Sequence, residues 1–158
     1  MANNGWTYQS AATTSGAAFD FAGIPAGVSE IEVHFNLVSL SGADNLLVQL
    51  GTSGGIETSG YSSGSGDRAY ESTSTNGLIV FRNNASVVSV NGAMRICDAL
   101  GTGFTWSASH ACSVRSSPPA IATSGGGNKT LSAVLDRVRL TRTGSTTFNG
   151  GTVYVCYR

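Results

Sequence analysis

The chain has 158 residues, a formal net charge of +0 and 11% charged side chains, well below the usual share of about 25%. Lys129 is the only lysine and basic residues form no cluster, which excludes the positively charged groove that nucleic-acid binding requires. No apolar run approaches the ~20 residues of a membrane-spanning helix, and no signal peptide is visible after Met1. We therefore expect a chain made in the cytoplasm, with neither nucleic acid nor a membrane as a partner.

Strands in the first third of the chain are predicted by side chains that alternate between apolar and polar. Ser29–Val38 is the clearest, with its apolar positions expected inside and the others in solvent: Ile31, Val33, Phe35 and Leu37 inside, Glu30, Glu32, His34 and Asn36 outside. A turn at Gly23–Gly27 precedes it. The other predicted strands are Gly5–Gln9, with Trp6 and Tyr8 on one face, Ala17–Phe21, with Phe19 and Phe21 buried, and Leu46–Leu50.

The segment Thr52–Asn76 is the longest without periodicity and is predicted to be a surface loop. A loop of this length in a compact domain is usually functional or packed against a partner. It carries residue types that make contacts at low entropic cost, and we predict four of them to bind a partner: Tyr61, Arg68, Tyr70 and Glu71. The alternative is a loop that is merely solvated.

Turn signals divide the second half of the chain into further short strands. Asn91–Gly92 is the strongest hairpin signal, and Asn83–Asn84 is a second break. Ser116–Pro119 and Gly125–Gly127 are predicted to bracket a flexible connector. The predicted strands are Gly77–Phe81, Val87–Val90, Ala93–Cys97, Phe104–His110 with His110 on the core face, and Gly150–Arg158.

The segment Leu131–Thr141 fits either a helix or a strand. Its apolar residues Leu131, Leu135 and Val138 have helical spacing, but they also fit a strand in which the parity changes once. We predict a strand with a bulge at Asp136–Arg137, because one extra residue moves the following side chains to the other face.

These elements predict one domain over residues 1–158 that is all-β. About eight to ten short strands, with a turn signal about every ten residues, are typical of a sandwich or barrel. We expect an antiparallel β-sandwich of the jelly-roll-like kind.

Nucleophilic catalysis is not predicted, although the pattern G-x-S-x-G occurs at Gly51–Gly55 and Gly60–Gly64. A nucleophile elbow needs a helix directly after the serine, and no helix is predicted after either match. The two histidines, His34 and His110, each lie within a strand pattern and are expected to be structural. Glu30 and Glu32 are expected to point into solvent rather than to form a glycosidase pair. We therefore expect a protein that is not an enzyme.

Neither a metal ion nor a cofactor is expected. The aspartates are isolated in the sequence and form no D-x-D-x-D loop. The three cysteines, Cys97, Cys112 and Cys156, are odd in number and lack a C-x-x-C spacing, so we expect them to be reduced and in or near the core. A disulfide or a metal-binding pair among them is the alternative.

Five segments resemble, in this order, a small β-domain of tailed-bacteriophage virion proteins, which often lies at the far end of tail fibres. They are FDFAGIP at residues 19–25, the strand Ile31–Leu37, LVQLGTSGGIETSGY at 47–61, LSAVLDRVRLT at 131–141 and FNGGTVYV at 148–155. The resemblance spans nearly the whole chain, and its most specific parts are QLG-x-SGGIE-x-SGY in the third segment and LDRVRLT in the fourth. No catalytic residues are attached to that domain.

The resemblance implies a virion structural protein that is synthesised in the host cytoplasm and displayed on the particle surface. Because the domain starts almost at Met1, without an anchor or shaft, the leading expectation is a capsid decoration (cement) protein that binds and stabilises the assembled head. The alternative is a receptor-binding tail-fibre or tail-tip module, and the third is a surface glycan hydrolase. The expected partners are two further copies in a homotrimer, the major capsid protein or tail and fibre proteins, and a host-surface glycan.

Overall fold

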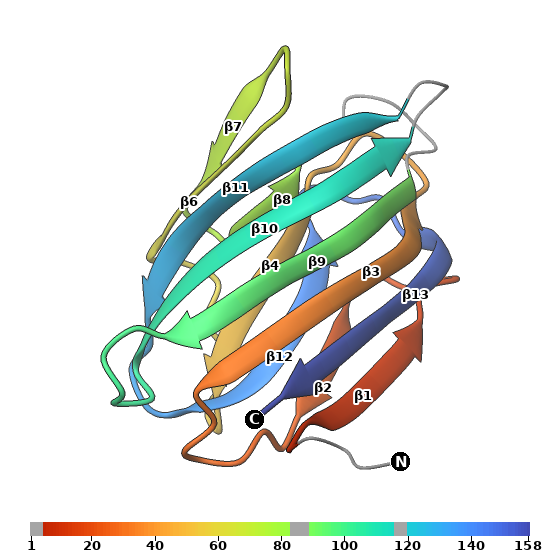
Figure 1. Cartoon of the computed structure of the whole chain (residues 1–158). Coiled ribbons are helices and arrows are strands. Elements are labelled where there is room, and N and C mark those ends of the chain that lie inside the picture. Colours follow the sequence, from red (N-terminus) through yellow and green to blue (C-terminus); the bar gives the residue numbers. More distant parts are fainter. Residues whose placement is uncertain (1–4, 83–88, 116–119) are drawn as a thin grey trace.

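The computed structural model describes residues 5–82, 89–115 and 120–158, and these residues form thirteen strands in two antiparallel sheets (Figure 1). The predicted all-β sandwich is thus confirmed, with more strands than expected. The strands are β1 (Thr7–Ala12), β2 (Phe19–Ala22), β3 (Glu30–Leu40), β4 (Leu46–Thr52), β5 (Gly55–Ile56), β6 (Tyr61–Gly66), β7 (Glu71–Ser74), β8 (Leu78–Phe81), β9 (Ser89–Asp98), β10 (Thr105–Arg115), β11 (Ile121–Thr130), β12 (Leu135–Arg142) and β13 (Phe148–Tyr157). Within the described ranges, no helix is long and apolar enough to cross a membrane.

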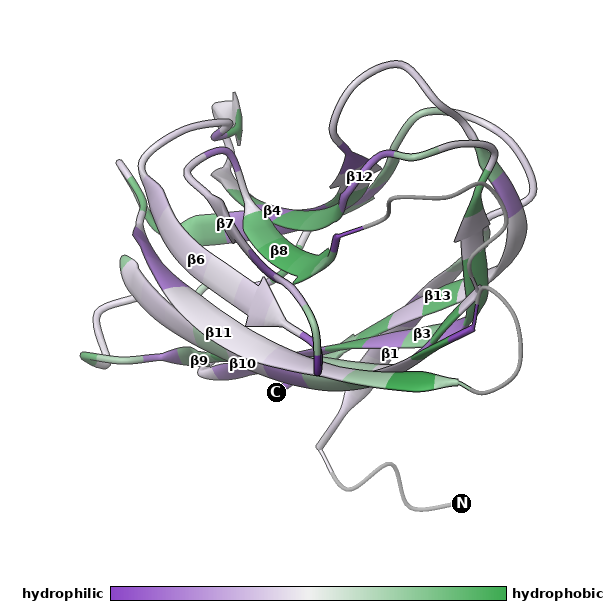
Figure 2. Cartoon of the chain, turned by 90° about the horizontal axis from the view of Figure 1, so that it is seen from above, coloured by the Kyte–Doolittle hydropathy of each residue, from purple (hydrophilic) through white to green (hydrophobic). Residues whose placement is uncertain are grey.

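The large sheet has eight strands in the order β1-β13-β3-β9-β10-β11-β6-β7. The small sheet has the order β2-β12-β4-β5, with β8 also paired to β4. The large sheet curves, and the small sheet lies against its inner face (Figure 2). The last strand, β13, lies between β1 and β3, so both ends of the described chain meet in one sheet.

The core lies between the sheets and is built from the inward-facing residues of each strand. Ile31, Val33 and Phe35 are buried, as the alternation in β3 predicts. The prediction for Leu37 is wrong. Its side chain was expected inside but is 56% exposed, because the register of β3 against β9 shifts between Phe35 and Val38. Leu37 itself has a left-handed φ of 55°, and Val38 takes over the inward position.

The segment predicted to be one long loop contains three strands, β5, β6 and β7. The inward positions of β6 include Ser63 and Ser65, whose hydroxyls bond to the backbone of β8. Ser63 Oγ accepts from the N–H of Ile79 at 2.9 Å, and Ser65 Oγ donates to the carbonyl of Val80 at 2.9 Å. Serine fills positions that are apolar in most strands, which explains why no hydrophobic period was visible.

The glycines Gly125–Gly127, predicted to end a flexible connector, lie in the middle of β11. A Cβ atom at Gly125 would lie 2.1 Å from the carbonyl oxygen of Gly64, and one at Gly127 would lie 2.4 Å from that of Ser62. Glycine is required here because β6 approaches the backbone of β11 too closely for any side chain. The segment Ser116–Pro119 lies outside the described residues.

One predicted turn is wrong, a second lies outside the described residues, and the predicted bulge is present. Asn91–Gly92 is not a hairpin turn but part of the continuous strand β9, where Gly92 has a φ of 137°. The predicted turn at Asn83–Asn84 lies outside the described residues, as does the start of the strand predicted at Val87–Val90. The bulge at Asp136–Arg137 is confirmed, because the pairing of β12 with β4 shifts register between Leu135 and Arg137.

Candidate functional site

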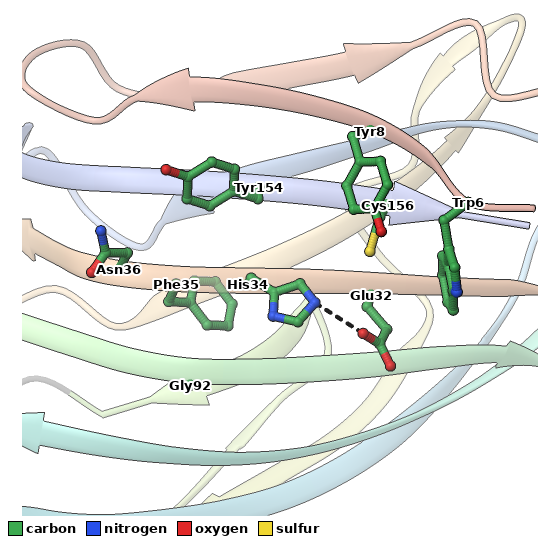
Figure 3. A pocket seen from close by; sticks show the side chains of 9 residues that line it. All are labelled: Trp6, Tyr8, Glu32, His34, Phe35, Asn36, Gly92, Tyr154 and Cys156. Atoms are coloured by element: carbon green, nitrogen blue, oxygen red, sulfur yellow. Dashed lines mark hydrogen bonds and ion pairs between the residues drawn. The ribbon is translucent and has the colours of Figure 1, made fainter. Parts of the chain in front are cut away.

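A pocket of about 690 Å³ opens on the face of the large sheet that is turned away from the small sheet, which we call the outer face (Figure 3). It lies over β1, β13, β3 and the neighbouring part of β9. Its lining combines three exposed or half-buried aromatic rings with a carboxylate, an imidazole, an amide and a thiol: Trp6, Tyr8, Glu32, His34, Phe35, Asn36, Gly92, Tyr154 and Cys156.

Strand pairing brings these residues together. Outward positions recur every second residue, so Glu32 and His34 lie side by side along β3. Across the ladder, Cys156 lies opposite Glu32, Tyr154 lies opposite His34, and Tyr8 lies opposite Cys156. Three strands that are far apart in sequence therefore present their outward side chains to one pocket.

The polar centre of the pocket is a hydrogen bond of 2.9 Å between His34 Nε2 and Glu32 Oε2. Glu30, the previous outward residue of β3, is held differently, because it forms ion pairs with both Arg95 and Arg158. The hydrogen bond from Arg158, with further help from Arg95, holds the pKa of Glu30 below its ordinary value against the effect of burial. Glu30 was expected to point into solvent; it is instead 8% exposed beneath the two arginines, because they neutralise its charge.

The aromatic rings form the edge of the pocket. Tyr8 is 60% and Tyr154 is 41% exposed. The guanidinium of Arg158 lies 4.6 Å from the centre of the Trp6 ring, an arrangement that fixes this ring by a cation–π contact. Exposed rings beside a few convergent polar groups are the usual composition of a small-molecule site.

The three cysteines are all free, as the sequence predicts. Cys156 is buried, and desolvation together with repulsion from Glu32 raises the pKa of its thiol. Burial also raises the pKa of Cys112, to about 11. At neutral pH both thiols are therefore protonated.

Three of the four predicted partner-binding residues lie together at the turn of the β6–β7 hairpin. Arg68, Tyr70 and Glu71 are all exposed there, with Tyr70 at 56%. The turn is ordered by Asp67 Oδ1, which accepts from the N–H of Tyr70 at 2.8 Å, and the guanidinium of Arg82 lies 5.2 Å from the Tyr70 ring.

The prediction that Tyr61, the fourth residue, binds a partner at the surface is wrong. Tyr61 lies at the start of β6 and is 3% exposed, so its side chain belongs to the core. Its hydroxyl accepts from the N–H of Leu50 at 2.8 Å and lies 2.8 Å from the carbonyl oxygen of Glu57. Lys129 Nζ lies over the Tyr61 ring, 5.3 Å from its centre. The same Nζ forms an ion pair with Glu57 Oε2 at 2.6 Å. The tyrosine was mistaken for a surface residue because serines, threonines and glycines surround it in the sequence.

The two G-x-S-x-G serines, Ser53 and Ser62, are both exposed, Ser53 between β4 and β5 and Ser62 in β6. The serine that does lie beside a histidine is Ser65, whose Oγ is 3.1 Å from His110 Nε2. Both are buried, burial lowers the pKa of His110, and His110 Nδ1 has no hydrogen-bond partner among the described residues. Without an acid on Nδ1 this pair lacks the third member of a triad, so it is a polar cluster of the core.

The outer-face pocket was not predicted from the sequence. Glu32 and His34 were assigned to the solvated face of β3, and Trp6 and Tyr8 to one face of another strand, but no signal placed β13 between these strands. Only the pairing β1-β13-β3 brings Tyr154 and Cys156 to them. No protein-family model, curated protein or solved structure matches the chain, so the argument for function depends on these residues.

Proposed function

We propose that the chain is a surface protein of a tailed-bacteriophage virion that recognises a carbohydrate through the outer-face pocket. The virion assignment depends on the sequence resemblance. The observation that supports carbohydrate recognition is the combination, in one open pocket, of aromatic rings with Glu32, His34 and Asn36. This corresponds to the receptor-binding alternative, with a host-surface glycan as the ligand.

The chemistry of the pocket fits a sugar. A pyranose ring has apolar C–H faces that stack on aromatic rings and hydroxyls that need hydrogen-bond donors and acceptors. Tyr8 and Tyr154 supply exposed rings, whereas Glu32 and His34 supply polar atoms beside them on β3. The volume of about 690 Å³ falls within the usual range for small-molecule sites of about 300–1,000 Å³.

Binding of the full chain to purified host-surface polysaccharide tests this proposal. Tyr154→Ala should weaken binding by about tenfold or more, which corresponds to about 1.4 kcal/mol. Tyr70→Ala is the control, because Tyr70 is a tyrosine on the distant hairpin that is 56% exposed, against 41% for Tyr154, and does not line the pocket. Equal binding by Tyr154→Ala and wild type would contradict the assignment of the pocket. Release of new reducing ends from the polysaccharide would instead support the glycan hydrolase alternative over a non-enzymatic module.

Capsid decoration is the second candidate, and a different surface favours it. Leu100, Phe104 and Val134 are exposed apolar residues, at 70%, 38% and 38%. They lie at one end of the sandwich, where the β9–β10 and β11–β12 connections meet. A hydrogen bond links the two connections, because the N–H of Leu131 donates to the carbonyl of Phe104 at 2.8 Å. Exposed apolar side chains that cluster in this way are typical of a protein-binding surface.

The two candidates differ in location and copy number. Decoration predicts a fixed, high copy number on purified heads, and loss of head binding in Leu100→Asp. A fibre tip predicts few copies and adsorption to host cells. In both cases we expect a homotrimer on the virion surface, because closed symmetry is the norm for such assemblies, and sedimentation of the purified chain measures it.

A further inference from the structure

We propose that Glu32, His34 and Cys156 form a binding site for a transition-metal ion of the zinc class. This inference goes beyond carbohydrate recognition and does not depend on it. Each residue offers one ligand atom, and these atoms all lie within 4.8 Å of one another (Figure 3).

The spacing of the ligand atoms is close to that of a coordination shell. Bonds of about 2.0–2.3 Å in a tetrahedral zinc site place neighbouring ligand atoms about 3.3–3.8 Å apart. His34 Nε2 and Glu32 Oε2 are now 2.9 Å apart. An ion would take the place of this hydrogen bond, and side-chain shifts of about 1 Å would bring the ligand atoms from within 4.8 Å to the spacing of the shell.

The backbone already holds the three residues in register. Cys156 and Glu32 are direct partners across the β13–β3 ladder, and His34 is the next outward residue of β3. Ligands on paired strands are positioned more precisely than ligands on loops. The metal site was not expected from the sequence, because Cys156 is more than a hundred residues from the other two ligands.

The set of donor atoms selects the class of ion. A thiol, an imidazole and a carboxylate together suit Zn²⁺ and Co²⁺, whereas Ca²⁺ and Mg²⁺ require oxygen ligands throughout. Three protein ligands leave a fourth position free, and Tyr8, the cross-strand neighbour of Cys156, lies on the side where the pocket opens. A water molecule or a ligand hydroxyl can occupy that position.

The two nearby arginines are paired to Glu30 and leave the carboxylate of Glu32 available to a cation. Arg95 is the cross-strand partner of Glu32, yet its guanidinium forms an ion pair with Glu30, as does that of Arg158. The carboxylate of Glu32 instead bonds to His34, which a divalent ion can displace.

Titration of the reduced, tag-free chain with cobalt chloride and zinc chloride tests the proposal. We expect one equivalent of Co²⁺ to bind with a thiolate-to-cobalt charge-transfer band in the near ultraviolet, and Zn²⁺ to displace it. Cys156→Ser should abolish the band and weaken zinc binding by more than about 100-fold, beyond the 10–100-fold typical of losing an outer-shell partner. His34→Gln should weaken binding similarly, and its exposed position makes it a safe variant for folding.

The matched control is Cys97→Ser, because Cys97 is a free cysteine on the outer face of β9, opposite Glu30 rather than Glu32. It should leave the band and the zinc affinity unchanged. The proposal is overturned if the wild-type chain shows no charge-transfer band, or if Cys97→Ser removes the band as completely as Cys156→Ser does. It is also overturned if His34→Gln, folded by circular dichroism, binds zinc as tightly as wild type.

Discussion

Tyr61→Phe removes a single oxygen atom from the core and isolates the effect of burying this tyrosine. The hydroxyl accepts from the N–H of Leu50 at 2.8 Å, and it lies 3.2 Å and 2.8 Å from the carbonyl oxygens of Leu50 and Glu57. The carbonyl of Leu50 keeps another donor, the N–H of Glu57 at 3.0 Å. The variant therefore leaves the N–H of Leu50 buried without its partner.

An orphaned buried donor costs about 1–3 kcal/mol, so we expect Tyr61→Phe to lower the free energy of unfolding by about 2 kcal/mol. For a chain of this size that corresponds to a fall in the melting temperature of roughly 4–8 °C. Equilibrium unfolding in urea at fixed protein concentration measures it, with an unchanged m-value. Tyr70→Phe, at the exposed hairpin turn, should change stability by less than about 0.5 kcal/mol. Equal effects of the two variants would refute the assignment of Tyr61 to the core.

Three other predictions concern the core and the serines. Phe35→Ala should lower the free energy of unfolding by about 3–5 kcal/mol in urea denaturation, whereas Asn36→Ala beside it should cost little; equal costs would show that the register of β3 is wrong. Because burial lowers the pKa of His110 from 6.5, the unfolded chain binds the extra proton first as the pH falls. Stability should therefore fall between pH 7.5 and 5.5, by at most about 1.4 kcal/mol, and His110→Gln should flatten this profile of melting temperature against pH. Ser53→Ala and Ser62→Ala should leave carbohydrate binding and any release of reducing ends intact, and a folded variant that loses either would revive the nucleophile hypothesis.

Alternation made the apolar strands predictable. Ile31, Val33 and Phe35 were placed correctly because each faces a core of ordinary apolar side chains. The bulge in β12 was also predicted, since one extra residue is the simplest way for a strand to change parity between Leu135 and Val138.

Strands that bury serine and glycine were not predictable in this way. In β6 the inward hydroxyls of Ser63 and Ser65 form hydrogen bonds to the backbone of β8. In β11 only glycine fits, because the backbone of β6 lies too close for a side chain. Both strands therefore lack the hydrophobic period that identifies a strand in sequence. The functional pocket was hidden for a different reason, because its residues become neighbours only through pairing between segments at opposite ends of the described chain.

The position of β13 between β1 and β3 has a consequence for the order of folding. These early strands cannot join one another in the native sheet until β13 has arrived between them. During synthesis the edges of β1 and β3 that β13 covers therefore stay unpaired until β13 has left the ribosome, and pairing with other chains competes in that period. Such non-local pairing is typical of slow folding, in milliseconds to seconds, and we expect the closing of the large sheet around β13 to be a late step.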